Sequence, residues 1–141
     1  MTRQTLLAVA LALASAAQAA DLAAHRWRER VLLVHVTHAK QAVWQRFEQS
    51  LREQSQALRE RDLVVYVLRD AHGIWRNGAP MSQADAEALR RHIDLAPGML
   101  QLIGTDGGVK LTQPLAQADL ERIHRTIDAM PMRQWEMQNR R

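Results

Sequence analysis

The sequence predicts an α/β domain with a four-stranded mixed sheet that carries helices on both faces. Two runs that are nearly all apolar, residues 31–36 and residues 63–68, have the composition of strands buried in a parallel sheet. The segment between them repeats its apolar residues near the helical period. An Asp106-Gly107 pair between two later apolar runs predicts a β-hairpin. Together these observations give the element order β-α-β-α-β-β-α.

The first half of the chain has the pattern of a strand-helix-strand unit. We expect a strand at residues 31–36 and a helix from residue 39 to about residue 61, with Phe47 and Leu51 on its buried face. The second strand follows at residues 63–68. A connection of this length between two strands implies parallel pairing and a right-handed crossover.

A loop and a capped helix come next. The glycine, asparagine and proline content of residues 71–80 indicates a loop. Ser82 then caps a helix, and Asp85 three residues later gives a weaker version of the capping box. The inner face of this helix consists of Ala86, Leu89 and Ile93.

The chain ends with a hairpin and a helix. The Pro-Gly pair at residues 97–98 interrupts the chain before a strand at residues 99–103, and the returning strand covers residues 109–111. The last helix begins near residue 115 and stops before Pro131, because the residue preceding a proline disfavours the helical conformation. Its apolar face consists of Leu120, Ile123, Ile127 and Met130.

Residues 1–19 have the parts of a secretory signal peptide. Arg3 supplies a positive charge, residues 6–14 are apolar, and Ala17 and Ala19 fit the small-x-small cleavage pattern. The apolar stretch is too short to span a bilayer. We therefore expect cleavage after Ala19, with residues 20–141 forming one domain in the periplasm or outside the cell.

The composition excludes several classes of function. There is no cysteine among the 141 residues, so the chain forms no disulfide and carries out no thiol redox or peroxidase chemistry. The 19 basic residues are interleaved with 15 acidic ones, which is typical of a solvated surface. With no recognition motif present, we expect no nucleic-acid partner.

The predicted element order is that of a minimal thioredoxin-like core. In thioredoxins, the joint between the first strand and the first helix holds the Cys-x-x-Cys motif. Here the joint is Val36-Thr37-His38-Ala39-Lys40. Pro97 precedes the third strand, where thioredoxin-like proteins carry a cis proline against the joint.

Thr37, His38, Lys40 and Pro97 are therefore the candidate binding residues. We expect the Thr37 hydroxyl to cap the first helix, with His38 and Lys40 in its first turn. The unpaired backbone N–H groups there make the surroundings electropositive. Such a joint favours an anionic group or a main-chain carbonyl, and it offers no nucleophile comparable to a thiolate. We assign no catalytic residue.

The pair His35 and His38 leaves an alternative open. Imidazole ligands at the joint suit copper or zinc in an exported protein, or a cysteine-independent enzyme. Histidines three apart on a strand point to opposite faces, so the two converge only if the chain turns at His38. The other interpretation is a half-buried structural His35 and a solvated His38.

The tail from residue 127 to residue 138 concentrates soft apolar side chains. They are Met130, Met132, Trp135 and Met137. Methionine is an adaptable packing residue that is also frequent at promiscuous binding surfaces. The tail either folds back to close the core or forms an exposed docking strip.

Three stretches resemble a family of exported bacterial proteins, the DUF4174 domain of unknown function. They are residues 58–63, residues 102–111 with Asp106, Gly107 and Gly108, and residues 127–133 with Met130, Pro131 and Met132, followed by residues 136–137. Related domains occur in animal extracellular sushi-repeat proteins. The resemblance implies a thioredoxin-like fold related to peroxiredoxins, without established catalytic residues. Members usually have Lys at the position of Thr105, and often Ala-Pro-Ser at residues 36–38.

The sequence thus predicts an exported, non-enzymatic thioredoxin-like module that binds a protein or peptide in the cell envelope. Thioredoxin-like domains hold extended peptides by main-chain hydrogen bonds beside the cis proline, a mode that needs no cysteine. We expect no cofactor and no membrane span. The alternative function is the metal-binding or enzymatic one at His35 and His38.

Overall fold

The computed structural model describes residues 22–38, 41–69 and 73–140. The expected signal peptide, residues 1–19, lies outside the described residues, and so does Lys40. Within the described ranges, no helix combines the length and the apolar character that crossing a membrane requires.

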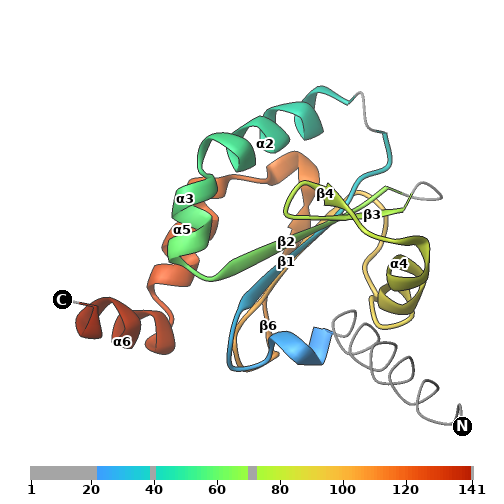
Figure 1. The fold of residues 1–141 in the computed structure, drawn as a ribbon. Coiled ribbons are helices and arrows are strands. Elements are labelled where there is room, and N and C mark those ends of the chain that lie inside the picture. Colours follow the sequence, from blue (N-terminus) through green and yellow to red (C-terminus); the bar gives the residue numbers. More distant parts are fainter. Residues whose placement is uncertain (1–21, 39–40, 70–72, 141) are drawn as a thin grey trace, which may run out of the picture.

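The centre of the molecule is a mixed sheet of six strands (Figure 1). In spatial order the strands are β4 (Ala79–Pro80), β3 (Ile74–Arg76), β2 (Leu63–Leu68), β1 (Arg30–His35), β5 (Met99–Ile103) and β6 (Val109–Pro114). Strand β1 runs parallel to β2 and antiparallel to β5. The prediction of a four-stranded sheet is wrong in number, because the hairpin β3–β4 extends the sheet beyond β2.

A two-residue turn builds the additional hairpin. Asn77 has φ +48° and Gly78 has φ +84°, the positive values that a turn between closely paired antiparallel strands requires. Asn77 also fastens the hairpin to β2: its backbone N–H donates to the Val65 carbonyl, and its side-chain oxygen accepts from the Val65 N–H, both at 2.8 Å. The prediction that residues 71–80 are only a loop is therefore wrong for residues 74–80.

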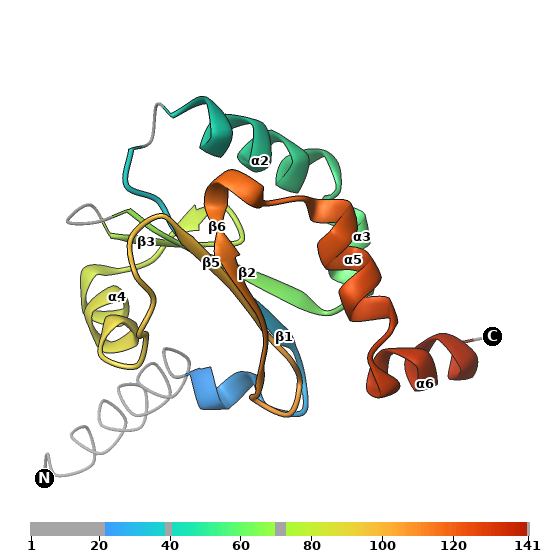
Figure 2. The same cartoon turned by 180° about the vertical axis from the view of Figure 1, so that it is seen from behind.

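Helices cover both faces of the sheet (Figures 1 and 2). One face packs against α2 (Ala42–Glu53), α3 (Ser55–Glu60), the 3-10 turn η3 (Leu115–Gln117) and α5 (Leu120–Asp128). The other packs against α4 (Gln83–Arg90) and the 3-10 turn η1 (Leu22–His25). Alternate residues of β1 supply the two cores, with Leu32 and Val34 in the first and Val31 and Leu33 in the second. This strand is therefore buried on both faces, as its composition predicts.

The first helix differs from the continuous helix expected at residues 39–61. Helix α2 begins at Ala42, and Gln54 interrupts the helical path with φ −104° and ψ +23° before α3 begins. The Gln54 side-chain oxygen accepts a hydrogen bond from His124 Nε2 at 2.8 Å. The break therefore lies against α5, and this tertiary contact compensates for the lost helical continuity.

The second half agrees more closely with expectation. Ser82 Oγ accepts from the Asp85 N–H at 3.2 Å and caps α4, and β5 has the predicted bounds. In the turn before β6, Gly107 has φ +82° and its N–H donates to the Gly104 carbonyl at 3.0 Å. Strand β6 continues three residues past the predicted end, to Pro114.

The expected last helix is two elements, and another helix follows it. After η3, Asp119 caps α5 by accepting from the Glu121 N–H at 3.0 Å. The path breaks before Pro131 as predicted, but Pro131 then opens α6 (Pro131–Asn139). Proline suits this first helical position because the N–H that it lacks has no partner within the helix.

Helix α6 leaves most of its apolar side chains in water. Met132, Trp135 and Met137 are exposed, Trp135 by 60%, whereas Met130 just before the helix packs against the first core. The interpretation that the tail closes the core with its apolar side chains therefore holds for Met130 alone. Helix α6 itself stands beyond α5 at the margin of the molecule (Figure 2).

Candidate functional site

The joint after β1 has a different local structure from the one predicted. Helix α2 has Gln41 at its N-cap, without a side-chain capping bond, so the prediction that Thr37 caps this helix is wrong. Sheet pairing explains the delay, because the Val36 N–H still donates to the Leu68 carbonyl at 2.8 Å. The chain then turns, with the Gln41 N–H donating to the His38 carbonyl at 3.1 Å. Thr37 is half-buried, and His38 is exposed ahead of the helix rather than in its first turn.

Pro97 lies in a turn near this joint but is not a cis proline. Every peptide bond of the described ranges is trans, so the expectation of a cis bond at Pro97 is wrong. The turn explains this: the Met99 N–H donates to the Ala96 carbonyl, and Gly98 has φ +76°. That is the geometry of a turn with trans proline in its second position and glycine in its third. The Gly98 N–H donates to the His35 carbonyl at 2.8 Å, which holds the turn at the end of β1.

The two histidines of the joint have separate surroundings. His35 is half-buried, and its Nδ1–H donates to the Leu95 carbonyl at 2.8 Å. His38 is exposed. No three His, Cys, Asp or Glu residues of the described part of the chain are grouped in a way that could hold a metal ion.

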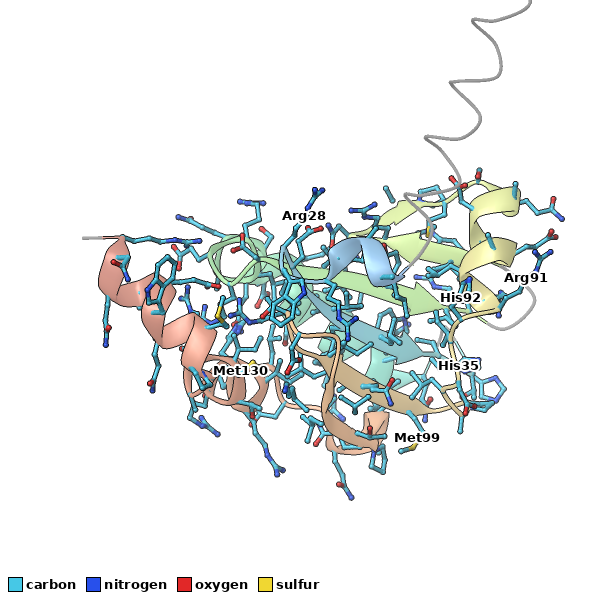
Figure 3. The ribbon with its side chains drawn as sticks, turned by 90° about the horizontal axis from the view of Figure 1, so that it is seen from below. Arg28, His35, Arg91, His92, Met99 and Met130 are labelled. Carbon is cyan, nitrogen blue, oxygen red and sulfur yellow. The ribbon has the colours of Figure 1, made fainter. Side chains whose placement is uncertain are left out.

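The other residues singled out from the sequence lie away from the joint. Figure 3 shows His35 and Met130 at opposite ends of the sheet. Asp106, Gly107 and Gly108 form the β5–β6 turn beside the start of β1, since Ile103 pairs with Val31. The Lys110 ammonium, followed by the Gly108 N–H, donates to Asp106 and holds the pKa of that carboxyl below its usual value. Met130, Pro131 and Met132 connect α5 to α6.

A hollow of about 540 Å³ lies between helices α2–α3 and strands β2–β3. Its lining residues come from two layers of the molecule. The helices contribute Trp44, Glu48, Leu51, Arg52, Ser55, Leu58 and Arg59, and the sheet contributes Leu63, Val65, Val67, Arg69, Trp75, Asn77 and Gly78. We call this hollow the margin pocket, because one of its sides is the added hairpin β3–β4 at the edge of the sheet.

The floor of the margin pocket is apolar. Val65 and Val67 face it from β2, while Val64 and Tyr66 belong to the core on the other face of the sheet. Leu51 and Leu58 line it from the helices. Large apolar groups that enter the pocket are therefore removed from water, which contributes about 25 cal/mol per Å² of apolar surface buried.

The rim of the margin pocket is charged. Glu48 accepts from Arg69 Nη2 at 3.0 Å and from Arg52 Nη1 at 3.3 Å. The Arg69 guanidinium also stacks over the Trp75 ring, 4.4 Å from its centroid. Arg59 makes no ion pair with any residue that the structure describes. Two guanidinium groups thus share the Glu48 carboxylate above an apolar floor, and Arg59 adds a third positive charge to the lining.

This arrangement suits binding more than it suits covalent chemistry. Guanidinium groups recognise carboxylates through paired N–H donors, and the planar Arg69–Trp75 stack holds one such group in place. Among the lining residues that the structure describes there is no histidine, and the one carboxylate, Glu48, already bridges two arginines. The pocket therefore favours a ligand that combines an apolar group with a negative charge.

The sequence contains one signal for this pocket, which lies within the predicted loop of residues 71–80. Asn77-Gly78 between Trp75-Arg76 and Ala79-Pro80 is a two-residue hairpin signal, and it places Trp75 on a strand. The sequence around Glu48 and Arg52 has the pattern of a solvent-exposed helix face. Nothing local in it indicates that Arg69 forms an ion pair with Glu48.

Comparison with protein families supplies one match. A family model described as a domain of unknown function (DUF4174) matches residues 21–136. No curated protein and no solved structure matches the chain.

Proposed function

We propose that this chain, which belongs to the DUF4174 family, is an exported thioredoxin-like module that binds a protein or peptide partner without thiol chemistry. The observation that carries the binding proposal is the margin pocket, with its apolar floor and arginine-rich rim. The absence of cysteine from the sequence removes the redox function of thioredoxins.

The arrangement of the inner four strands supports the thioredoxin-like assignment. They lie in the order β2-β1-β5-β6, with β1 parallel to β2 and with β5 and β6 forming an antiparallel hairpin. Helices pack on both faces, and a βαβ unit precedes the hairpin and its closing helix. The hairpin β3–β4 is then an addition at the β2 edge, where it creates the pocket.

The joint after β1 carries less of the proposal than the pocket does. Binding beside a cis proline was the mode expected there, and Pro97 is trans. The pocket has the size of a ligand site, since such sites commonly enclose about 300–1,000 Å³. It is open to solvent on one side, which suits one or two side chains of an extended peptide.

Export is part of the proposal and rests on residues 1–19. N-terminal sequencing of the product secreted into the periplasm should begin at Ala20. A product that starts at Met1 in the cytoplasm would remove the cell envelope as the place where the partner is found.

A random peptide library displayed on phage tests the binding proposal. We expect the protein of residues 20–141 to enrich specific peptides. The Ser55→Trp variant should lose them, because an indole at this exposed lining position fills the pocket without changing the core. Gln56→Trp is the matched control, since Gln56 is exposed on the same helix and does not line the pocket.

Two outcomes of this selection would count against the proposal, and a third would call for other variants. Failure of the wild type to enrich any peptide would overturn it outright. Equal enrichment by wild type and Ser55→Trp would remove the pocket as the site. Loss of enrichment in Gln56→Trp as well would show that the indole disturbs α3 and not the pocket. Leu51→Asn, which changes a lining residue, and Val43→Asn, which changes a similarly half-buried residue of α2 outside the lining, would then replace the two indole variants.

A further inference from the structure

The charges around the margin pocket do not balance. Of the lining residues that the structure describes, Arg52, Arg59 and Arg69 are basic and Glu48 is the one carboxylate. Arg52 and Arg69 share that carboxylate, whereas Arg59 pairs with no described residue. The pocket therefore attracts negative charge even with its own carboxylate in place.

Arg69 is held by its surroundings but is incompletely bonded. Its side chain is 28% exposed and lies against the Trp75 ring, so much of the guanidinium is out of water. Glu48 accepts from Nη2 alone, and the buried Nε–H has no hydrogen-bond partner among the residues that the structure describes. A carboxylate that binds arginine side-on uses Nε and Nη2 together. In the Arg69–Glu48 pair, the Nη2 donor is used and the Nε donor is not.

The contacts of Glu48 are ones that an incoming carboxylate can replace. Its carboxylate reaches from α2 into the rim and contacts Arg69 and Arg52, whose side chains are 28% and 71% exposed. Ion pairs with this much exposure contribute at most about 1 kcal/mol each. Exchange of the Glu48 carboxylate for another carboxylate keeps the number of charges at the rim constant and costs little.

We infer that the margin pocket recognises an acidic peptide segment with a large apolar side chain next to its carboxylate, and that Glu48 occupies the position of that carboxylate in the free protein. This inference rests on the proposed function. The apolar side chain enters over Val65 and Val67, and the carboxylate binds Arg69 as Glu48 swings toward solvent, while Arg59 adds positive charge to the lining. Glu48 is then a built-in competitor that lowers the affinity for weakly acidic segments.

Sequences from the same peptide library give the first readout. We expect wild-type selections to be enriched in Asp or Glu adjacent to aromatic or large aliphatic residues. The most enriched peptide is then synthesised with a fluorescent label, together with a twin in which Gln replaces Glu and Asn replaces Asp. Fluorescence anisotropy should show at least about tenfold tighter binding of the acidic form, weakening as salt is raised.

Two substitutions separate the roles of the rim residues. Glu48→Gln keeps a hydrogen-bond acceptor for Arg69 but removes the competing charge, so we expect it to raise the affinity for the acidic peptide about threefold or more. Arg59→Gln should lower that affinity about twofold to fivefold. Arg125→Gln is the matched control, because Arg125 is exposed on α5 away from the pocket and should change nothing.

The outcomes distinguish this inference from the proposed function. If Ser55→Trp abolishes binding but the selected peptides are not acidic, or if Glu48→Gln weakens binding of the acidic peptide, the inference is overturned and the peptide-binding pocket stands. If no peptide is enriched, both fail. If no peptide is enriched but sodium dodecanoate binds the wild type and not Ser55→Trp, the occupant is an anionic lipid chain.

Discussion

Helices α5 and α6 are consecutive, each nine residues long, and they attach to the body of the molecule in different ways. Helix α5 buries Leu120, Ile123 and Ile127 in the first core, together with His124. Helix α6 buries Arg133 and no apolar residue. One helix is thus part of the core, and the other is a charged attachment to it.

Hydrogen bonds and ion pairs hold α6 in place. Arg133 donates to Asp128 and to the Glu60 carbonyl, both at 3.0 Å. Glu136 accepts from both Nη atoms of Arg30, whose side chain is completely buried at the start of β1. Because these contacts are directional and polar, they fix the helix while its Trp135 face remains in water. Attachment of a helix therefore does not require an apolar face.

The sharpest test of the comparison is Ile123→Ala in α5. Ile123 is fully buried, and removing its side chain beyond Cβ leaves a cavity in the first core. We expect the free energy of unfolding to fall by about 2–5 kcal/mol in chemical denaturation. Arg122→Ala, exposed on the same helix, is the control and should change it by less than about 0.5 kcal/mol. Equal small effects would show that α5 is not part of the core.

The next largest effect should come from Glu136→Ala in α6. This change leaves the buried Arg30 guanidinium without a carboxylate, and we expect a loss of about 2–3 kcal/mol, less than for a fully buried pair because Glu136 is partly exposed. Glu136→Gln should cost less, since its amide oxygen still accepts from Arg30. Gln138→Ala serves as the exposed control. A loss from Glu136→Ala no larger than the control's would mean that the ion pair does not hold α6.

Acid should weaken the junction between the two helices. Burial acts to raise the pKa of Asp128, but hydrogen bonds from Arg61 and Arg133 outweigh it and hold this pKa below the ordinary value of 3.8. Below that value the unfolded chain binds the proton first, so the contribution of Asp128 is present above pH 3.8 and is lost as the pH falls through the lower, folded pKa. Between pH 6 and pH 2, the denaturation midpoint of Asp128→Asn should fall less steeply than that of the wild type. Parallel plots of midpoint against pH for the two proteins would contradict this.

The smallest effect should come from Trp135→Ser. Trp135 is 60% exposed, so its removal should change the free energy of unfolding by less than about 0.5 kcal/mol despite the size of the side chain. Chemical denaturation beside the wild type measures this. A loss above about 1 kcal/mol would place Trp135 in a packed interface and make α6 resemble α5.

Local signals in the sequence predicted some elements to the residue. The continuous apolar run of β2 and the break at Pro97-Gly98 before β5 set bounds that agree with the structure. The hairpin at Asn77-Gly78 was equally local, but the Gly and Pro content of its loop concealed two strands of three and two residues. Strands this short carry too few residues to show a period.

The candidate site depends on contacts between distant residues and was less predictable. Arg69 meets Glu48 across 21 positions of sequence, and no spacing rule connects a strand end to the side of a preceding helix. At the joint, analogy with thioredoxins placed the start of the first helix too early, because pairing of Val36 with Leu68 keeps the chain extended. Pairing within the sheet overrode the capping preference of Thr37.

The ion pair between Arg30 and Glu136 joins two residues that are 106 positions apart in the sequence. The central strand β1 pairs with β2 and β5, yet its buried guanidinium gains a carboxylate only when α6 is in place. A chain that stops before Glu136 therefore assembles most of the sheet around an uncompensated charge. The integrity of helix α6 is thereby coupled to the stability of the central strand.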